Sequence, residues 1–295
     1  MDMVNKDVQA AAYRVPPRTR VGKVRLAVSN LEQSLAFYED VIGFRAIERQ
    51  ASRAALGMKD SERVLLELEE RPGLRPLTSP RLGLYHFAVL LPTRESLGSF
   101  ALHLASLGVR AGSADHLVSE AFYLVDPDGL TVEVYSDRDR SEWRYLGGEV
   151  MMAVDPLDMG GLIEASAGEK WEGLPEGTTV GHMHFYVGEM AAGRAFYDAG
   201  LGLDVMSRLG EAALFLAAGG YHHHVAINTW ARHSGVAAEG DPRLLEWELV
   251  VPDSSDVEGV SRSLEAGGHA VDRSEGKVRF RDPWGIVVSL VGERA

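Results

Sequence analysis

A duplicated motif constrains this chain more than any other feature of its sequence. Residues 37–44, FYEDVIGF, recur as residues 196–203, FYDAGLGL, 159 residues later. A second motif repeats in the same order, because residues 126–129, DPDG, return as residues 282–285, DPWG, each time before an apolar run. Periods of this length indicate a duplicated structural unit, so equivalent positions can be compared inside one sequence.

Length, charge and cysteine content narrow the class of protein. The 295 residues suffice for two ordinary domains, and 45% hydrophobic with 25% charged residues is typical of a globular protein. The formal net charge of −13 would repel phosphate backbones and anionic membranes, so we expect neither nucleic acid nor membrane as a partner. There is no cysteine to supply a thiolate ligand or nucleophile. No apolar run is long enough to span a membrane, and we expect a cytoplasmic protein.

The repeats divide the chain into four similar modules. Each opens with a strand rich in β-branched or aromatic residues, continues with a helix and closes with two or three strands. Helix signals recur at matching places: Asn30 fits an N-cap, Gly43 and Gly202 fit helix ends, and Pro92-Thr93 and Pro252-Asp253 mark helix starts. The expected bounds are 1–20 for a tail, 21–135 for modules one and two, 136–179 for a linker, and 180–292 for modules three and four.

This pattern resembles the vicinal oxygen chelate superfamily of glyoxalases, bleomycin-resistance proteins and extradiol ring-cleaving dioxygenases. The segments LYHFAVLLP (84–92), DHLVSEA (115–121), GYHHH (220–224) and NTW (228–230) are similar to bacterial catechol 2,3-dioxygenase-like proteins. The resemblance implies an α+β fold of four βαβββ modules paired into two half-open β-barrels, with a divalent metal inside a barrel. We expect modules one and two to form one barrel, and modules three and four the other.

In the amino-terminal half, the ligand positions that the resemblance implies do not suit a metal. They carry Lys23, His86 and Glu133. A protonated lysine has no lone pair for a metal and repels a cation. We therefore interpret this half as a vestigial site without metal, in which Lys23 pairs with a carboxylate such as Glu67 or Glu133.

The carboxy-terminal half is the better candidate for the metal. Its equivalent positions carry His182, Glu246 and Ser289, and Ser289 is a poor ligand. Three further histidines are available on a predicted strand: His222, His223 and His224. We expect His182, Glu246 and one of these histidines to converge on one ion, with the choice of histidine left open. The resemblance implies that His223 is the residue that carries protons to and from the substrate.

The function implied by the resemblance is extradiol cleavage of a catechol-type aromatic ring by dioxygen. Fe(II) is the ion implied first, with Mn(II) as the alternative. We expect Tyr221, Asn228 and Trp247 to contact the small aromatic substrate, and the protein to act alone or as a homo-oligomer. Two other hypotheses stay open: a metal-free protein of the bleomycin-resistance type that sequesters a small molecule, and a glyoxalase-like metal-dependent isomerase or lyase.

Overall fold

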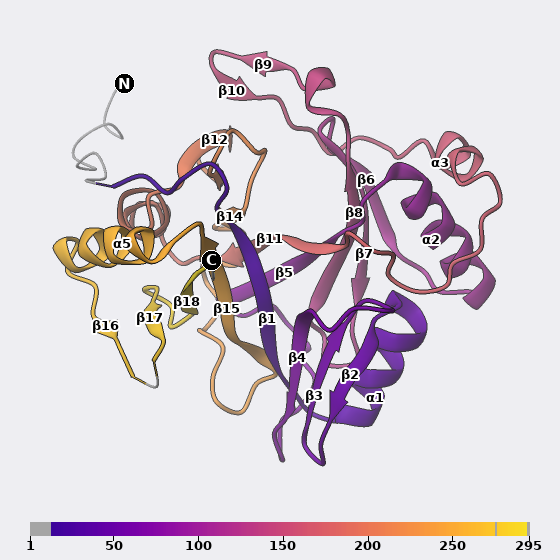
Figure 1. Cartoon of the computed structure of the whole chain (residues 1–295), viewed down its shortest axis with the longest axis horizontal. Helices are drawn as coiled ribbons and strands as arrows, with labels where there is room; N and C mark the ends of the chain where they lie inside the picture. The colour runs from indigo at the N-terminus through magenta and orange to yellow at the C-terminus, as the bar shows by residue number, and fades with distance from the viewer. Residues whose placement is uncertain (1–12, 275, 294–295) are drawn as a thin grey trace.

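Two eight-stranded sheets form the framework of the computed structural model, which describes residues 13–274 and 276–293 (Figure 1). The first sheet has the order β2 (Arg45–Arg49), β3 (Arg53–Gly57), β4 (Val64–Glu70), β1 (Arg20–Val28), β15 (Arg243–Val251), β18 (Val287–Gly292), β17 (Val278–Arg281) and β16 (Val271–Asp272). The second has the order β12 (Asp204–Leu209), β13 (Ala213–Ala217), β14 (Val225–Asn228), β11 (Thr179–Tyr186), β5 (Gly83–Leu90), β8 (Thr131–Asp137), β7 (Ser119–Val125) and β6 (Gly112–Asp115). The two orders match position for position, which confirms the repeat and the α+β fold of paired modules.

The predicted pairing of the modules is wrong. The first sheet joins module one to module four through the antiparallel pair β1–β15, and the second joins module two to module three through β5–β11. Both sheets are therefore shared between the two halves of the chain. The constant offset showed that the modules are equivalent, but it carries no information about which modules are neighbours.

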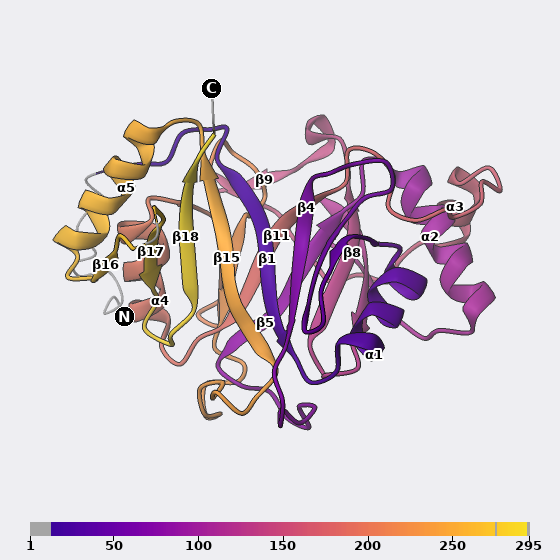
Figure 2. The ribbon, with the colours of Figure 1, turned by 60° about the horizontal axis from the view of Figure 1, so that its bottom comes forward.

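Alternation along the central strands gives each sheet one apolar and one polar face. On β11, Met183 and Phe185 are fully buried in the core, while His182 and His184 point to the other side. Figure 2 shows the two sheets one behind the other, with β1, β15 and β18 in front of β5, β8 and β11. Their apolar faces pack against each other in one common core, where Phe185 lies 5.9 Å from Trp247 of β15 between ring centroids. The polar faces thus line the two half-barrels.

Short helices follow the first strand of each module. Their bounds are Leu31–Ala36 (α1) with the π-helical turn Phe37–Ile42 (η1), Arg94–Leu107 (α2), Met190–Arg194 (α4) with the π-helical turn Ala195–Gly200 (η3), and Ser254–Ala266 (α5). The predicted caps are confirmed, because Asn30 accepts a hydrogen bond from the Gln33 amide and Asp253 forms a capping box on α5. Gly43 ends η1 with φ of +95°, a conformation that favours glycine.

The two repeated motifs contact each other. The Tyr38 hydroxyl donates to Asp126 Oδ2 over 2.9 Å, and at the equivalent place the Tyr197 hydroxyl donates to Asp282 Oδ2 over 2.9 Å. Each aspartate begins a hairpin turn between two antiparallel strands, as predicted. The tyrosine of one module is thus tied to the hairpin of the next module in the sequence, across the sheet boundary.

The segment between the two halves of the chain packs on modules two and three. It contains a 3-10 turn, Arg140–Glu142 (η2), the short hairpin Tyr145–Leu146 (β9) and Glu149–Val150 (β10), and the helix Met159–Ala165 (α3), which packs on α2. Of the expected tail, residues 1–12 lie outside the described residues, and Tyr13 and Arg14 bond to Asp256 and Asp198. None of the helices in the described ranges has the length and hydropathy needed to cross a membrane.

Candidate metal centre

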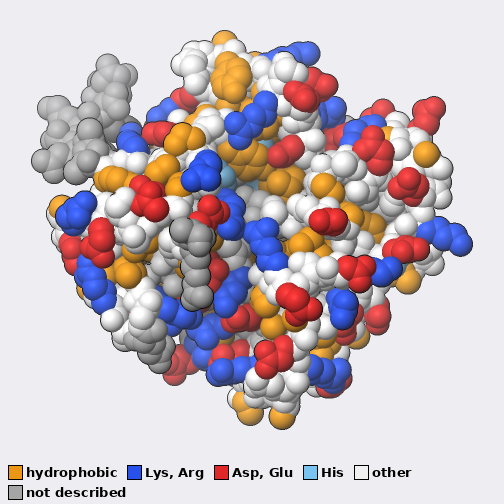
Figure 3. All heavy atoms as spheres, viewed as in Figure 1, with side chains coloured by type: hydrophobic (Ala, Val, Ile, Leu, Met, Phe, Trp, Pro, Cys, Tyr) orange, Lys and Arg blue, Asp and Glu red, His pale blue; other side chains and the backbone are white. Residues whose placement is uncertain are grey.

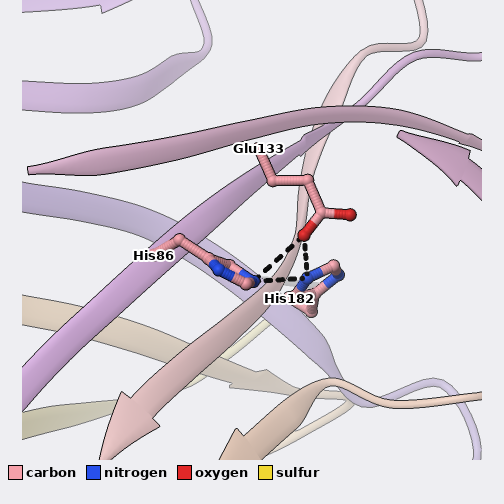
Figure 4. Close-up of side chains that lie close together, drawn as sticks. All are labelled: His86, Glu133 and His182. Atoms are coloured by element: carbon pink, nitrogen blue, oxygen red, sulfur yellow. Dashed lines mark hydrogen bonds and ion pairs between the residues drawn. The ribbon is translucent and has the colours of Figure 1, made fainter. Parts of the chain in front are cut away.

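Three neighbouring strands at the middle of the second sheet bring two imidazoles and one carboxylate together. His86 comes from β5, Glu133 from β8 and His182 from β11, all on the polar face (Figure 4). The Nε2 atoms of the two histidines are 3.3 Å apart, and Glu133 Oε2 lies 3.0 Å from His86 Nε2 and 3.1 Å from His182 Nε2. The three donor atoms therefore form a nearly equilateral triangle.

This triangle fits one face of the coordination shell of a divalent ion. Nitrogen and oxygen ligands lie about 2.0–2.2 Å from such ions, so two donors at right angles are roughly 2.8–3.1 Å apart. The two edges to Glu133, 3.0 and 3.1 Å, fall within this range, and the 3.3 Å edge between the two Nε2 atoms is slightly longer. Two histidines and one carboxylate on one face are the facial triad typical of non-haem iron sites.

Hydrogen bonding alone does not satisfy the three donor atoms. An ionised Glu133 only accepts, so both Nε2 atoms would have to carry protons to donate to it. The short contact between the two Nε2 atoms requires instead that one of them lacks its proton. A cation resolves this conflict, because it accepts a lone pair from all three atoms at once.

Burial sets the charge state that a metal needs. The three side chains are only 2–3% exposed. Burial lowers the pKa of His86 and of His182, although the nearby Glu133 opposes this. Burial alone would raise the pKa of Glu133, but His182 and His86 outweigh it and hold that pKa well below its usual range. Near neutral pH both imidazoles are thus neutral and Glu133 is ionised, which are the states in which these groups bind a metal.

The structure does not bring the predicted carboxylate, Glu246, to His182. Glu246 lies on β15 in the first sheet, where it accepts from Arg25 Nη2 over 3.1 Å and lies 3.5 Å from Arg279 Nε. The only cluster of metal-ligand type among the described residues joins His182 to His86 and Glu133. His86 and Glu133, interpreted from the sequence as a vestigial pair, thus lie with His182 in a cluster that both halves of the chain contribute to.

Lys23 and Ser289 occupy the corresponding positions in the first sheet. Lys23 Nζ lies 2.6 Å from Glu67 Oε1, which confirms the predicted ion pair with that residue. Ser289 is buried on β18. Neither residue belongs to the cluster around His182.

The three consecutive histidines precede a strand and are not part of one. β14 begins only at Val225, and in the irregular segment before it His222, His223 and His224 are all buried. The ring of His223 lies 4.1 Å from the ring of His182 between centroids. His224 Nδ1 instead accepts from the Ala218 amide, and burial lowers the pKa of His224 to about 3. Of the three consecutive histidines, His223 is thus the one beside the cluster of His86, Glu133 and His182.

A chain of hydrogen bonds fixes the tautomer of His223. His222 Nε2 lies 2.8 Å from Asp137 Oδ1, and because the carboxylate accepts, this nitrogen carries the proton. With the proton of His222 on Nε2, its Nδ1 is the acceptor in the 2.7 Å contact with His223 Nδ1, which donates the hydrogen bond. The remaining nitrogen of His223, Nε2, keeps a free lone pair. Burial lowers the pKa of His223 well below its usual range, which agrees with a neutral ring.

A tyrosine beside Glu133 was missed by the sequence reasoning. Tyr123 is paired directly with Glu133 in the β7–β8 hairpin, and burial, followed by Glu133, raises its pKa well above the usual value. The Tyr123 hydroxyl lies 2.6 Å from His116 Nε2, and His116 Nδ1 donates to the Ala153 carbonyl over 2.7 Å. Counting back across the DPDG turn would have placed Tyr123 opposite Glu133.

Aromatic side chains surround the cluster on the side of β5 and β11. Tyr85 lies 4.7 Å from His86 and 5.8 Å from Trp230 between ring centroids, and Trp230 is 52% exposed. Asn228 is hydrogen-bonded to His184 Nε2 over 2.8 Å, and the ring of His184 lies 4.9 Å from that of His86. These residues form a partly open aromatic wall next to the donors.

The other expected substrate contacts have different surroundings. Trp247 is fully buried in the core on the apolar face of β15, so the structure does not bring it to the site. Tyr221 is 8% exposed, and its hydroxyl bonds to Tyr135 over 2.7 Å and to Asp137 over 3.2 Å. It supports the Asp137–His222 contact and does not face the three donors directly.

Comparison with known proteins identifies the family of this chain. The family model described as the glyoxalase/bleomycin resistance protein/dioxygenase superfamily matches residues 20–134. A catechol-2,3-dioxygenase of Bacillus subtilis (strain 168) is 39% identical over 269 residues, which cover 90% of this chain and 94% of the relative. The chain belongs to this superfamily.

Solved structures of the superfamily share the fold at low sequence identity. A provisionally named dioxygenase from Bacillus subtilis subsp. subtilis strain 168 superposes with a TM-score of 0.66 at 12% identity, covering 96% of this chain and 87% of the other. Glyoxalase I from Zea mays superposes with a TM-score of 0.55 at 16% identity, covering 93% and 92%. Proteins named for different activities therefore share this fold, and activity has to be argued from the site.

Proposed function

We propose that this protein is an Fe(II)-dependent extradiol dioxygenase, which cleaves a catechol-type aromatic ring with dioxygen. The observation that carries the proposal is the triangle of His86, Glu133 and His182, with its edges of 3.0 to 3.3 Å. The name of the Bacillus subtilis relative supports the same reaction class. Mn(II) has similar ligand preferences and is the alternative ion.

Iron in this position would supply Lewis acidity and a common point at which an aromatic diol and dioxygen meet. The protein would supply the exclusion of water, the orientation of the substrate and the transfer of protons. The three donors are buried, so bulk water is largely excluded from the reacting groups. Tyr85 and the half-exposed Trp230 offer ring faces and edges against which an aromatic substrate can be oriented.

Proton transfer is assigned to His223. Its free Nε2 lone pair can take a proton from a substrate hydroxyl, and the protonated ring can return that proton to the product. Protonation of His223 leaves its Nδ1 donating to His222, which is itself held by Asp137. Asp137 therefore stabilises the protonated state through His222 and acts as a positioning residue.

The test combines metal content with ring cleavage. Protein purified without oxygen and loaded with Fe(II) should bind about one ion per chain and convert catechol to the yellow ring-fission product. Glu133→Gln should lose metal binding and turnover together, because the two remaining imidazoles hold a divalent ion poorly. We expect the metal affinity to fall by at least about a hundredfold, since loss of an outer-sphere partner alone often costs 10–100-fold.

Glu246→Gln is the matched control for the carboxylate. It removes the same charge by the same substitution on β15, the strand of the first sheet that is equivalent to β5, and should leave the metal content unchanged. His223→Ala should keep the metal and lower kcat by roughly 10²–10³, the usual contribution of a general base. Metal uptake without any ring cleavage would favour the glyoxalase-like hypothesis, and no metal uptake would favour the metal-free binding protein.

A further inference from the structure

A cavity of about 640 Å³ lies on the first sheet, away from the candidate metal centre, between β1, β15, β17, β18 and the start of β5. Five arginines line it: Arg25, Arg71, Arg243, Arg279 and Arg281. The lining acids are Glu239, Glu246 and Asp272. In Figure 3, Lys and Arg side chains gather on the middle of the face that carries β1 and β15. Basic side chains thus outnumber acidic ones in the lining of this cavity, although the formal net charge of the chain is −13.

Two of these arginines are bonded only to main-chain oxygens. Arg243 Nη1 donates to the carbonyls of Ala238, Glu239 and Asp241 over 2.9, 3.0 and 3.3 Å. Arg281 Nη1 donates to the Gly285 carbonyl over 3.3 Å. Among the residues that the structure describes, neither guanidinium forms an ion pair with a carboxylate. Their charges are thus not matched by direct partners.

Like charges also face one another across the cavity. Arg71 shares the lining with Arg243, and after burial it is the largest influence lowering the pKa of Arg243. Arg71 uses its Nε on Glu69 over 3.0 Å, which leaves its Nη atoms for other partners. Arg25 Nε is buried and has no hydrogen-bond partner in the described protein. The carboxylate of Glu69 also acts on Arg243, but it is shared among Arg71, Arg25 and Arg53. A further anion bound among these guanidinium groups would therefore relieve the repulsion that remains between them.

The repeat explains why a cavity exists here. Arg25 is paired with Glu246 across β1 and β15 in the same register that pairs His184 with His86 across β11 and β5. The first sheet therefore has the same curled frame as the second, with ionic side chains in place of the imidazoles. The frame provides a concave site on both sheets, and the side chains decide what each site binds.

We propose that this cavity is a binding site for an organic carboxylate, separate from the metal centre and independent of its reaction. Arg71, Arg243 and Arg281 would hold the carboxylate, because the planar guanidinium matches both carboxylate oxygens. Leu82, Leu84 and Trp284 line the same cavity and would contact the apolar body of the ligand. The volume lies within the range of small-molecule sites.

Benzoate is a suitable probe, with benzamide as its uncharged analogue of similar shape. Isothermal titration of the iron-loaded protein should show benzoate binding that weakens as salt is added and is absent for benzamide. Benzoate can also ligate a metal, so the titration is repeated with His182→Ala, in which binding at the arginine cavity should persist. Equal binding of benzamide, or loss of all benzoate binding in His182→Ala, would overturn the proposal.

Two substitutions locate the site. Arg71→Gln and Arg281→Gln should each weaken benzoate binding to His182→Ala by roughly tenfold to a hundredfold, the effect of losing a charge-assisted hydrogen bond. Arg49→Gln is the matched control, because Arg49 lies on β2 with its side chain 50% exposed and pairs with Glu32. Unchanged benzoate binding in both cavity variants contradicts the proposal. So does a protein that binds inorganic phosphate but shows no binding of benzoate at concentrations up to about 10 mM.

Discussion

The buried Tyr38–Asp126 pair makes the stability of this protein depend on pH. Burial raises the pKa of Asp126 to about 7 from an ordinary value of 3.8, although the carboxylate accepts bonds from Tyr38, the Asp128 amide and the Leu130 amide. The folded protein therefore holds this proton more tightly than the unfolded chain does. The resulting stability is fully present below about pH 4 and is lost as the pH rises through about 7.

The expected size of this effect follows from the two pKa values. A difference of about 3 pKa units corresponds to about 4 kcal/mol over the whole titration, and to about 2–3 kcal/mol between about pH 5 and pH 8. Asp126→Asn removes the titration while keeping an oxygen for the two amides. The unfolding free energy of the wild type should fall between the two pH values, and that of the variant should fall by about 2–3 kcal/mol less. Urea denaturation at both pH values measures the difference.

Asp282 is an internal comparison for this prediction. It accepts from Tyr197 in the same way, but burial raises its pKa only to about 6. Asp282→Asn should therefore remove about 1–2 kcal/mol of the same decline, less than Asp126→Asn. If both variants keep the wild-type dependence on pH, or if their order is reversed, burial does not control these carboxyl groups in the way argued here.

Three further predictions concern the site and its frame. Asp137→Asn should retain the metal and lower kcat by about tenfold, because His222 loses its charged partner; equal kcat by the catechol assay would refute the relay. Trp230→Ala should raise KM for catechol with little change in metal content or kcat, and an unchanged KM would remove Trp230 from the substrate wall. Gly43→Ala should lower the unfolding free energy by at least about 1–2 kcal/mol, because the left-handed residue would gain a Cβ 2.7 Å from Trp171 Nε1. Full stability in urea would contradict this last argument.

Much of the fold could be predicted because it depends on local signals. Helix caps at Asn30 and Asp253, the left-handed Gly43 and the two hairpin turns are set by neighbours in the sequence. The alternation of His182 and His184 with buried apolar residues was equally readable. These signals define each module, and the repeat shows that the modules are equivalent.

The pairing of modules could not be read in the same way. β1 and β11 are almost equally apolar on their core faces, so either could have joined the strand of another module without changing its own pattern. The ligand set depends on this pairing. Within one half of the chain, His86 with Glu133 and His182 alone are incomplete sets, and only the shared sheet brings the two imidazoles and the carboxylate together. Residues 221–224 also do not form a strand. The alternation of side chains along a strand therefore could not predict which of the three histidines lies beside His182.

The sharing of both sheets between the halves has a consequence for how the chain is made. On the ribosome, β5 and β8 emerge long before β11, and β1 emerges long before β15. Until the second half has been synthesised, both nascent half-sheets keep an unpaired edge at their central strand, which is a template for pairing with another chain. A fragment that stops within residues 136–179 carries His86 and Glu133 but has neither the third ligand nor the strand that covers this edge. Such a truncated product is expected to aggregate, whereas co-expression with the missing half should rescue both its solubility and its metal uptake.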